Sequence, residues 1–505
     1  MVNSKTKGEN HAMTEPNAHP HSARRLRYVI IGAGMAGIVT AIRLRERGDA
    51  DFIVYEKGDK VGGTWRENRY PGLTCDVHAH AYTYSFAPYP EWTRFFAGGP
   101  EIQRYFEWVT DEWGIRDSIR FNREITACRY QGGRWHIELS DGGRDVADVV
   151  IAATGVLHHP NIPEIPGLAD FAGPSFHSAR WPDGLPLEGK RVGIIGSGST
   201  GVQIVCGLSD TAARIVHFSR TPQWINPTPD FAYSEAERQA FRDDPAKIEA
   251  LRNGEAYWNG VTEFNNAIVD PNSPEMAAIE ARVLRNLEDN VKDPILREKL
   301  RPAYRPICKR LVSSPDYYDH AQRPNVTIEV GTIERVEKDG IRMKDGAFHP
   351  LDVIVLATGF RADRFVRPIT VTGENGIVLD DVWAVRPSAY LAVSVPNFPN
   401  FFLINGPTGP VGNFSLIDIA EREWNYIDQL LEPIRIGRYA AVAATPDAFA
   451  SYEKRRIAAA KTTIWGTGCT SWYLDSEGVP SSWPWTYSRF AEEMTKPKLE
   501  DFNYR

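Results

Sequence analysis

Two stretches of the chain repeat one pattern, in which an apolar run is followed by a glycine-rich turn and by apolar residues at helical spacing. In the first stretch, the apolar run Tyr28–Ile31 predicts a buried strand, and a second run, Phe52–Tyr55, ends at Glu56. The turn has the form Gly-x-Gly-x-x-Gly, with its glycines at Gly32, Gly34 and Gly37. Glycines let the backbone approach a pyrophosphate, and a carboxylate roughly 20 residues later accepts from a ribose hydroxyl. The pattern therefore predicts a dinucleotide-binding unit.

The second copy differs from the first at one informative position. The run Arg191–Ile195 precedes the same glycine turn, and the next apolar strand ends at Arg220, where the first copy has Glu56. A ribose 2'-phosphate is strongly anionic, so a carboxylate would repel it and an arginine attracts it. The second unit is therefore predicted to bind NADPH; the alternative is that Arg220 is a solvated surface charge. The residues assigned to this nucleotide are Gly196, Gly198, Ser199, Thr200, Gly201, Gln203, Arg220 and Thr221.

The remaining pattern predicts how these units are joined. Two further apolar strands end in Ala-Thr-Gly, at residues 149–155 and 353–359, and residues from about 230 to 306 read as helical. There, Ser273 can cap a helix with one apolar stripe, and a late helix is expected over residues 416–431. The predicted class is α/β, with two Rossmann-like dinucleotide-binding domains and a helical insertion. The predicted divisions are a disordered tail (1–26), a first domain (27–164), a second domain (165–389) and a return to the first domain with an aromatic-rich tail (390–505).

Composition excludes several classes of function. The 505-residue chain has a net charge of -7 and no basic stripe for nucleic acid. No apolar run approaches the roughly 20 residues of a membrane helix, and the first 26 residues lack the apolar core of a signal peptide. These features predict a cytoplasmic protein without nucleic-acid or membrane partners. Oligomeric state stays open.

The cysteines show none of the spacings of a metal or redox centre. They are Cys75, Cys128, Cys206, Cys308 and Cys469, with no Cys-x-x-Cys pair. This disfavours zinc or any other metal, a disulfide framework and a dithiol centre. It also excludes the chemistry of pyridine-nucleotide disulfide reductases, which need a vicinal redox pair.

A short segment between the two glycine turns carries a specific signature. It contains Phe171, Gly173, His177, Trp181 and Pro182, in the order Phe-x-Gly-x-x-x-His-x-x-x-Trp-Pro. This pattern resembles type I Baeyer-Villiger monooxygenases, with Ser in place of the commoner Thr after the histidine. N-oxygenating relatives have Tyr and a basic residue where this chain has Trp-Pro. The resemblance implies conversion of a ketone to an ester or lactone with FAD, NADPH and dioxygen, through a flavin peroxide.

A second segment, residues 62–76, resembles another motif of this family, Gly-Gly-x-Trp-x4-Tyr-Pro-Gly-x3-Asp. The family pattern places the first dinucleotide unit on FAD. By the resemblance, the residues that line FAD besides the glycine turn and Glu56 are Gly63, Thr64, Trp65, Cys75, Asp76 and Tyr82. The departures are Arg66 and Glu67, where relatives often have aromatic residues. Trp65 could alternatively be core packing.

The resemblance also supplies the expected catalytic cation. Lys309 and Arg310 resemble the family segment in which the lysine contacts phosphate and the arginine serves the active site. Arginine suits this role because it remains protonated and offers a planar fork of donors. We expect Asp76 to pair with Arg310 and hold its orientation. The alternative is that Arg310 forms a structural salt bridge between domains.

Two regions are expected to shape the reaction without performing it. His177 is expected to act in a linker that couples domain movement to oxygenation, not as an acid or base. The loop 405–414 resembles the family's substrate loop, with Val411, Asn413 and Leu416 as candidate substrate contacts. The identity of the ketone is not readable. Alternative functions are N- or S-oxygenation, or an NADPH-consuming flavin reductase or oxidase without oxygen transfer.

Overall fold

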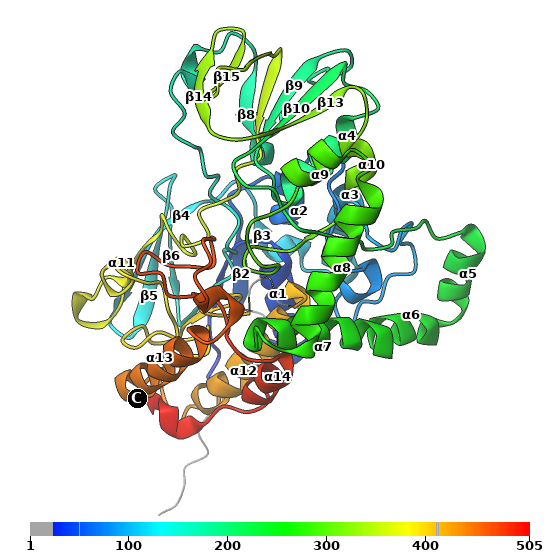
Figure 1. Ribbon diagram of the computed structural model, residues 1–505. Coiled ribbons are helices and arrows are strands. Elements are labelled where there is room, and N and C mark those ends of the chain that lie inside the picture. The colour runs from blue at the N-terminus through cyan, green and yellow to red at the C-terminus, as the bar shows by residue number, and fades with distance from the viewer. Residues whose placement is uncertain (1–23, 50, 411, 413) are drawn as a thin grey trace, which may run out of the picture.

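The computed structural model describes residues 24–49, 51–410, 412 and 414–505. Its centre is a pair of parallel sheets, one in each lobe of the molecule (Figure 1). The first sheet has the order β19-β7-β1-β2-β3. Its strands are β1 (Tyr28–Ile31), β2 (Phe52–Tyr55), β3 (Ile119–Arg120), β7 (Val149–Ala152) and β19 (Phe401–Leu403). Because β19 comes from beyond the second lobe, the chain returns to complete the sheet with which it began.

The second sheet repeats this arrangement with the order β13-β10-β9-β17-β8. Its strands are β8 (Ser175–His177), β9 (Arg191–Ile195), β10 (Arg214–Ser219), β13 (Val326–Val330) and β17 (Val353–Leu356). Apart from the first residues of β9 and β10, the strands at the centre of both sheets are buried, which is why they read as continuous apolar runs. The predicted fold class is confirmed.

Smaller sheets extend each lobe. One has the order β18-β4-β5-β6, with β4 (Ile125–Gln131), β5 (Arg134–Leu139), β6 (Arg144–Ala147) and β18 (Thr370–Thr372). The others are β14 (Ile333–Glu337) with β15 (Gly340–Met343) and β16 (Phe348–Pro350), β11 (Ile225–Asn226) with β12 (Val312–Ser313), and β20 (Val442–Ala444) with β21 (Phe502–Tyr504). Strand β18 lies inside the predicted second domain, 165–389, but pairs with β4 of the first. This pairing favours a boundary nearer residue 359; the other boundaries stay predictions.

Helices cover both sheets. The first lobe carries α1 (Met35–Arg47), α2 (Thr64–Glu67), α3 (Gly99–Glu112), α11 (Leu379–Val382), α12 (Leu416–Arg435), α13 (Pro446–Ala460) and α14 (Tyr487–Glu493). The second carries α4 (Ser199–Leu208) and α10 (Tyr317–Ala321). Helix α12 packs against α1 and runs past the predicted end at residue 431. Pro433 lies in its last turns and does not end it.

The predicted helical insertion consists of α5 (Glu235–Asp243), α6 (Pro245–Arg252), α7 (Glu255–Val269), α8 (Pro274–Asn290) and α9 (Pro294–Lys299). The Ser273 hydroxyl accepts from the Met276 amide, so the predicted cap of α8 is confirmed. The predicted apolar stripe of α8 is fully buried: Met276, Ile279, Val283 and Leu287. In Figure 1, α8 rises from α7 beside the first lobe toward α10 in the second. The insertion therefore packs against both lobes.

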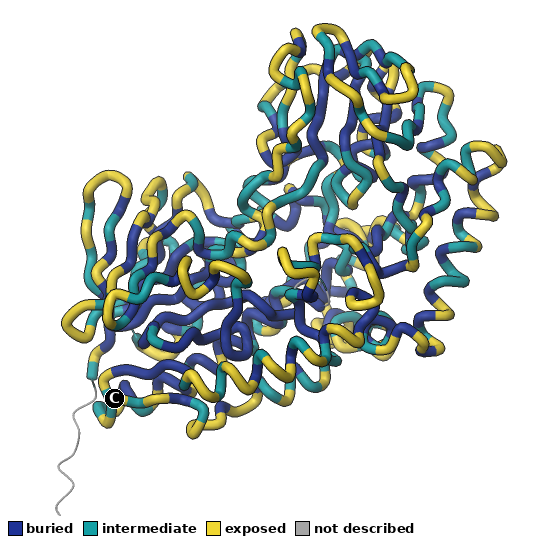
Figure 2. Tube along the Cα trace, turned by 60° about the vertical axis from the view of Figure 1, so that its left-hand side comes forward, coloured by how far each residue is buried: buried dark blue, intermediate teal, exposed yellow. Residues whose placement is uncertain are grey.

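Burial is concentrated inside each lobe, and exposed segments gather in the loops between elements (Figure 2). Within the described part of the chain, no helix combines the length and the apolar character needed to cross a bilayer.

One prediction about the cysteines is wrong. Cys308 and Cys469 form a disulfide across a sequence separation of 161 residues, although sequence spacing disfavoured a disulfide framework. Spacing detects local pairs, whereas this pair is created by the tail folding back onto the segment before β12. Cys75, Cys128 and Cys206 are free.

Candidate functional site

The first glycine turn is built so that helix α1 begins against the end of β1. A Cβ on Gly37 would lie 1.9 Å from the Gly32 carbonyl oxygen, so no larger residue fits there. The Glu56 carboxylate accepts from the Ala33 amide at 2.8 Å, which fixes the carboxylate beside the turn. Gly34 caps α1 without a side chain, leaving the amides of its first turn available to an anion.

A cleft of about 1080 Å³ opens in front of this turn. Of the residues predicted to line FAD, the cleft is lined by Gly32, Gly34, Glu56, Gly63, Thr64 and Trp65. Met35, Arg66 and Asn405 also line it, and sequence reasoning did not assign them to the cofactor. These surroundings fit FAD, because a glycine turn, a helix N-terminus and the Glu56 carboxylate meet at one cleft.

Tyr82 and Cys75 were predicted to line FAD but lie behind the residues that line the cleft. The Trp65 indole donates to the Tyr82 hydroxyl at 3.1 Å, and the two rings meet edge to face. Tyr82 thereby orients Trp65 at the cleft wall. Cys75 is buried, and burial raises the pKa of its thiol. Among the described residues that line the cleft, neither Tyr82 nor Cys75 occurs.

Arg66 and Glu67, which depart from the family pattern, form an ion-pair network with Glu56. The Arg66 guanidinium donates to Glu56 at 2.7 Å and to Glu67 at 2.5 Å. Burial opposes its charge, but the two carboxylates outweigh burial and raise the pKa of Arg66. In this chain Arg66 therefore pairs with Glu56 at a position that departs from the family pattern.

The second glycine turn repeats the packing of the first. A Cβ on Gly201 would lie 1.9 Å from the Gly196 carbonyl oxygen, whereas the space in front of Gly198 is open. Arg220 is exposed at the end of β10. Burial, with the nearby charge of Arg220, lowers the pKa of Lys309. Two cations thus lie close enough to repel each other.

Gln203, which the sequence assigned to NADPH, is engaged inside the protein. Its amide donates to the Thr74 carbonyl at 3.1 Å and its oxygen accepts from the Tyr70 hydroxyl at 3.0 Å. Gly72 has φ of +80°, and a Cβ there would lie 2.2 Å from the Gln203 carbonyl oxygen. The Tyr-Pro-Gly motif is thus explained by close packing of the FAD-side segment on helix α4.

Arg310 joins segments that are distant in sequence. Its guanidinium donates to Asp76 at 2.5 Å and to the Gly412 carbonyl, and it also bonds the Tyr473 hydroxyl. About a third of the Arg310 side chain, 31%, is exposed. Burial opposes its charge, but Asp76 and Tyr473 outweigh burial and raise the pKa of Arg310. The predicted pairing of Arg310 with Asp76 is confirmed.

Two partners of Arg310 were expected near the site but not as partners of this arginine: Gly412 in the expected substrate loop, and Tyr473 in the aromatic tail expected to pack on the FAD domain or roof the site. Gly412 has φ of +84°, and a Cβ there would lie 2.9 Å from the Tyr473 hydroxyl. Tyr473 belongs to the aromatic tail, whose richness in rings was the available signal. Val411 and Asn413 lie outside the described residues. Leu416 is the first residue of α12. It is partly buried and packs against the hydrophobic core of the first lobe, so its contact with substrate stays a prediction.

The Phe171 segment forms the edge strand β8 of the second sheet. His177 is buried; its Nε2 donates to the Gly359 carbonyl at 2.9 Å and its Nδ1 accepts from the Ala179 amide at 3.1 Å. Burial lowers the pKa of His177, which favours the neutral ring. Trp181 packs edge to face on Phe176. A Cβ on Gly173 would lie 2.3 Å from the Asp352 carbonyl oxygen. The buried ring of Phe171 lies in the core of that lobe.

The fold and the two glycine turns define a flavin- and pyridine-nucleotide-type oxidoreductase. Residues 29–243 match the family model described as pyridine nucleotide-disulphide oxidoreductase. The chain is 38% identical to a Baeyer-Villiger monooxygenase of Streptomyces coelicolor over 489 residues, covering 96% of this chain and 93% of the relative. It is 43% identical to an uncharacterized monooxygenase of Mycobacterium tuberculosis, covering 94% and 95%.

Solved structures agree with these relatives. The structure of OTEMO with FAD and NADP superposes with a TM-score of 0.85 at 27% identity, covering 96% of this chain and 100% of that chain. Cyclohexanone monooxygenase from Rhodococcus sp. Phi1 bound to NADP+ gives 0.83 at 28% identity, covering 95% and 99%. The chain belongs to the Baeyer-Villiger monooxygenase family.

Proposed function

We propose that this protein converts a ketone to an ester or lactone, using FAD, NADPH and dioxygen, in the cytoplasm. The observation that carries the proposal is the position of Arg310, whose guanidinium is held by Asp76 and the Gly412 carbonyl of the FAD-side segments. When bound, FAD accepts hydride from NADPH and activates dioxygen. The substrate is a small-molecule ketone.

The chain's own residues bind the two nucleotides, orient Arg310 and stabilise the charge that develops on the substrate. The first glycine turn and Glu56 hold the FAD pyrophosphate and ribose, and the second turn with Arg220 and Lys309 holds NADPH. Arg310 donates to the negative charge that develops on the ketone oxygen, and it needs no proton transfer because its guanidinium stays protonated. Asp76 and Tyr473 are positioning residues that fix the fork of donors.

Product analysis with labelled oxygen tests the proposal. The holoenzyme is supplied with NADPH, ¹⁸O₂ and a panel of cyclic, aryl, linear and polycyclic ketones. We expect one ¹⁸O atom in an ester or lactone, with about one NADPH consumed per product. A keto-sulfide in the same panel distinguishes oxygenation at sulfur. Consumption of NADPH with hydrogen peroxide as the sole product from every ketone would contradict the proposal.

We expect His177→Ala to release about two- to tenfold more hydrogen peroxide per NADPH, as loss of one buried hydrogen bond would allow. The bond from His177 to the Gly359 carbonyl ties strand β8 to the chain crossing between the lobes. Stopped-flow flavin reduction should stay near the wild-type rate, because the residue is not placed at the cofactors. The control is His136→Ala, on the exposed face of β5. Equal peroxide release by both variants would assign His177 to structure alone.

A further inference from the structure

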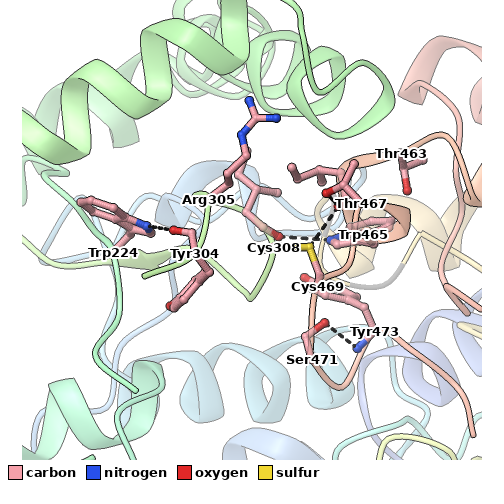
Figure 3. The surroundings of a disulfide bond; sticks show 12 residues. Trp224, Tyr304, Arg305, Cys308, Thr463, Trp465, Thr467, Cys469, Ser471 and Tyr473 are labelled. Carbon is pink, nitrogen blue, oxygen red and sulfur yellow. Dashed lines mark hydrogen bonds between the residues drawn. A yellow bond between two sulfur atoms is a disulfide. The ribbon is translucent and has the colours of Figure 1, made fainter. Parts of the chain in front are cut away.

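The disulfide lies beside the proposed active-site arginine. Cys308 precedes Arg310 by two residues, and Cys469 precedes Tyr473, which bonds Arg310. The two Cα atoms are 5.3 Å apart, within the range that a disulfide bridges without backbone movement. Figure 3 shows the tail segment folding against the Cys308 segment at this point.

The tail contacts the arginine segment at three successive places. The buried Trp465 indole donates to the Ile307 carbonyl at 3.2 Å, Cys469 bonds Cys308, and the Tyr473 hydroxyl bonds Arg310. The Tyr473 ring stacks on Trp465 with centroids 4.5 Å apart, so the contacts form one unit.

Ile307 shows that the segment needs this support. Its φ is +67°, in the left-handed region that a β-branched residue rarely adopts. Such a conformation persists only where the surroundings hold it in place. Here the Trp465 bond holds the Ile307 carbonyl and the disulfide holds the next residue. Loss of the disulfide would release one side of that restraint, three residues from the catalytic guanidinium.

We propose that Cys308 and Cys469 form a redox-modification site whose disulfide positions Arg310 through the C-terminal tail. The role of the disulfide in positioning Arg310 rests on the proposed function, whereas the pairing of Cys308 with Cys469 does not. The reductant is a dithiol. Its thiolate attacks one sulfur of the bond and displaces the other cysteine as a thiolate. Its second thiolate then attacks the mixed disulfide and displaces the remaining cysteine, so that the dithiol becomes a cyclic disulfide; the two protons that the dithiol lost protonate the two cysteine thiolates. Two electrons pass to the protein.

The disulfide is shielded from solvent. Cys308 and Cys469 are each 7% exposed. Thiolate attack on a disulfide requires access to a sulfur. We therefore expect slow reduction of the disulfide in the folded holoenzyme. Reduction should be faster when the tail residues are displaced from the Cys308 segment.

The experiment compares one holoenzyme in two redox states. Thiols are alkylated at cell lysis, and mass spectrometry of the unfolded protein should find Cys308 joined to Cys469, with the other three cysteines alkylated. A second sample is reduced with dithiothreitol and freed of it before assay. We expect about tenfold more hydrogen peroxide per NADPH after reduction, since misplacement of about 1 Å can cost 10²-fold in rate. Reoxidation should restore ester formation.

Two variants make the result specific. The double variant Cys308→Ser/Cys469→Ser should release as much hydrogen peroxide per NADPH as the reduced wild type, and dithiothreitol should not change that amount. Cys206→Ser keeps the disulfide and should respond as wild type does. Alkylation of all five cysteines at lysis contradicts the pairing of Cys308 with Cys469, and equal coupling of the oxidised and reduced holoenzymes contradicts the positioning role. If the oxidised holoenzyme forms no ester from any ketone, the proposed function fails; if both states form it equally, only the positioning role fails.

Discussion

Arg310→Ala is expected to lower ester formation about a hundred- to thousandfold, the usual loss when one donor to a developing oxyanion is removed. The variant should still bind FAD and oxidise NADPH, because the residues assigned to both nucleotides are intact. NADPH consumption should therefore end in hydrogen peroxide. Parallel measurement of NADPH, peroxide and ester on saturating ketone separates these outcomes.

Further variants separate catalysis from a structural salt bridge. Arg310→Lys keeps a charge but loses the planar fork that bonds both Asp76 and Gly412. We expect only partial recovery of ester formation. The matched control is Arg282→Ala, which removes a guanidinium paired with Glu263 inside the helical insertion. Ester formation by Arg310→Ala within a few-fold of wild type would show that the guanidinium is structural.

Elements set by local pattern were predictable. The glycine turns, the strands before them and the cap of α8 each depend on neighbouring residues, and the structure has them at the expected places. Helix α12 extends past the end expected at about residue 431, because the tertiary packing of that helix keeps its last turns formed even at Pro433.

The contacts around Arg310 could not be derived from local pattern. Arg310 and Asp76 are separated by 234 residues, and only the family resemblance suggested their pairing. The Cys308–Cys469 bond, Tyr473 and Gly412 depend on how the tail folds back, for which spacing holds no information. Arg66 was recognised as a departure, but its bond to Glu56 required the geometry of the cleft. Long-range contacts therefore build the site on a frame that local sequence specifies.

Arg220→Ala is expected to reduce the preference for NADPH over NADH about ten- to hundredfold, since a charge-assisted hydrogen bond contributes about 1.5 to 3 kcal/mol. Arg220 is exposed at the carboxyl end of β10 and lies near Lys309, so the two cations can share one 2'-phosphate. The measurement is the ratio of kcat/KM for the two nucleotides. A loss confined to NADPH identifies the phosphate contact, because NADH lacks that group.

The size of the loss of NADPH preference in Arg220→Ala is expected to depend on Lys309. Burial, with a further contribution from the charge of Arg220, lowers the pKa of Lys309; removing Arg220 relieves only the second of these, and the remaining lysine should hold part of the phosphate. The double variant Arg220→Ala/Lys309→Ala should therefore lose more preference than either single variant. Arg214→Ala, exposed at the opposite end of β10, is the control and should leave the ratio unchanged. An unchanged ratio in Arg220→Ala would instead make this arginine a solvated surface charge and would leave the 2'-phosphate to Lys309.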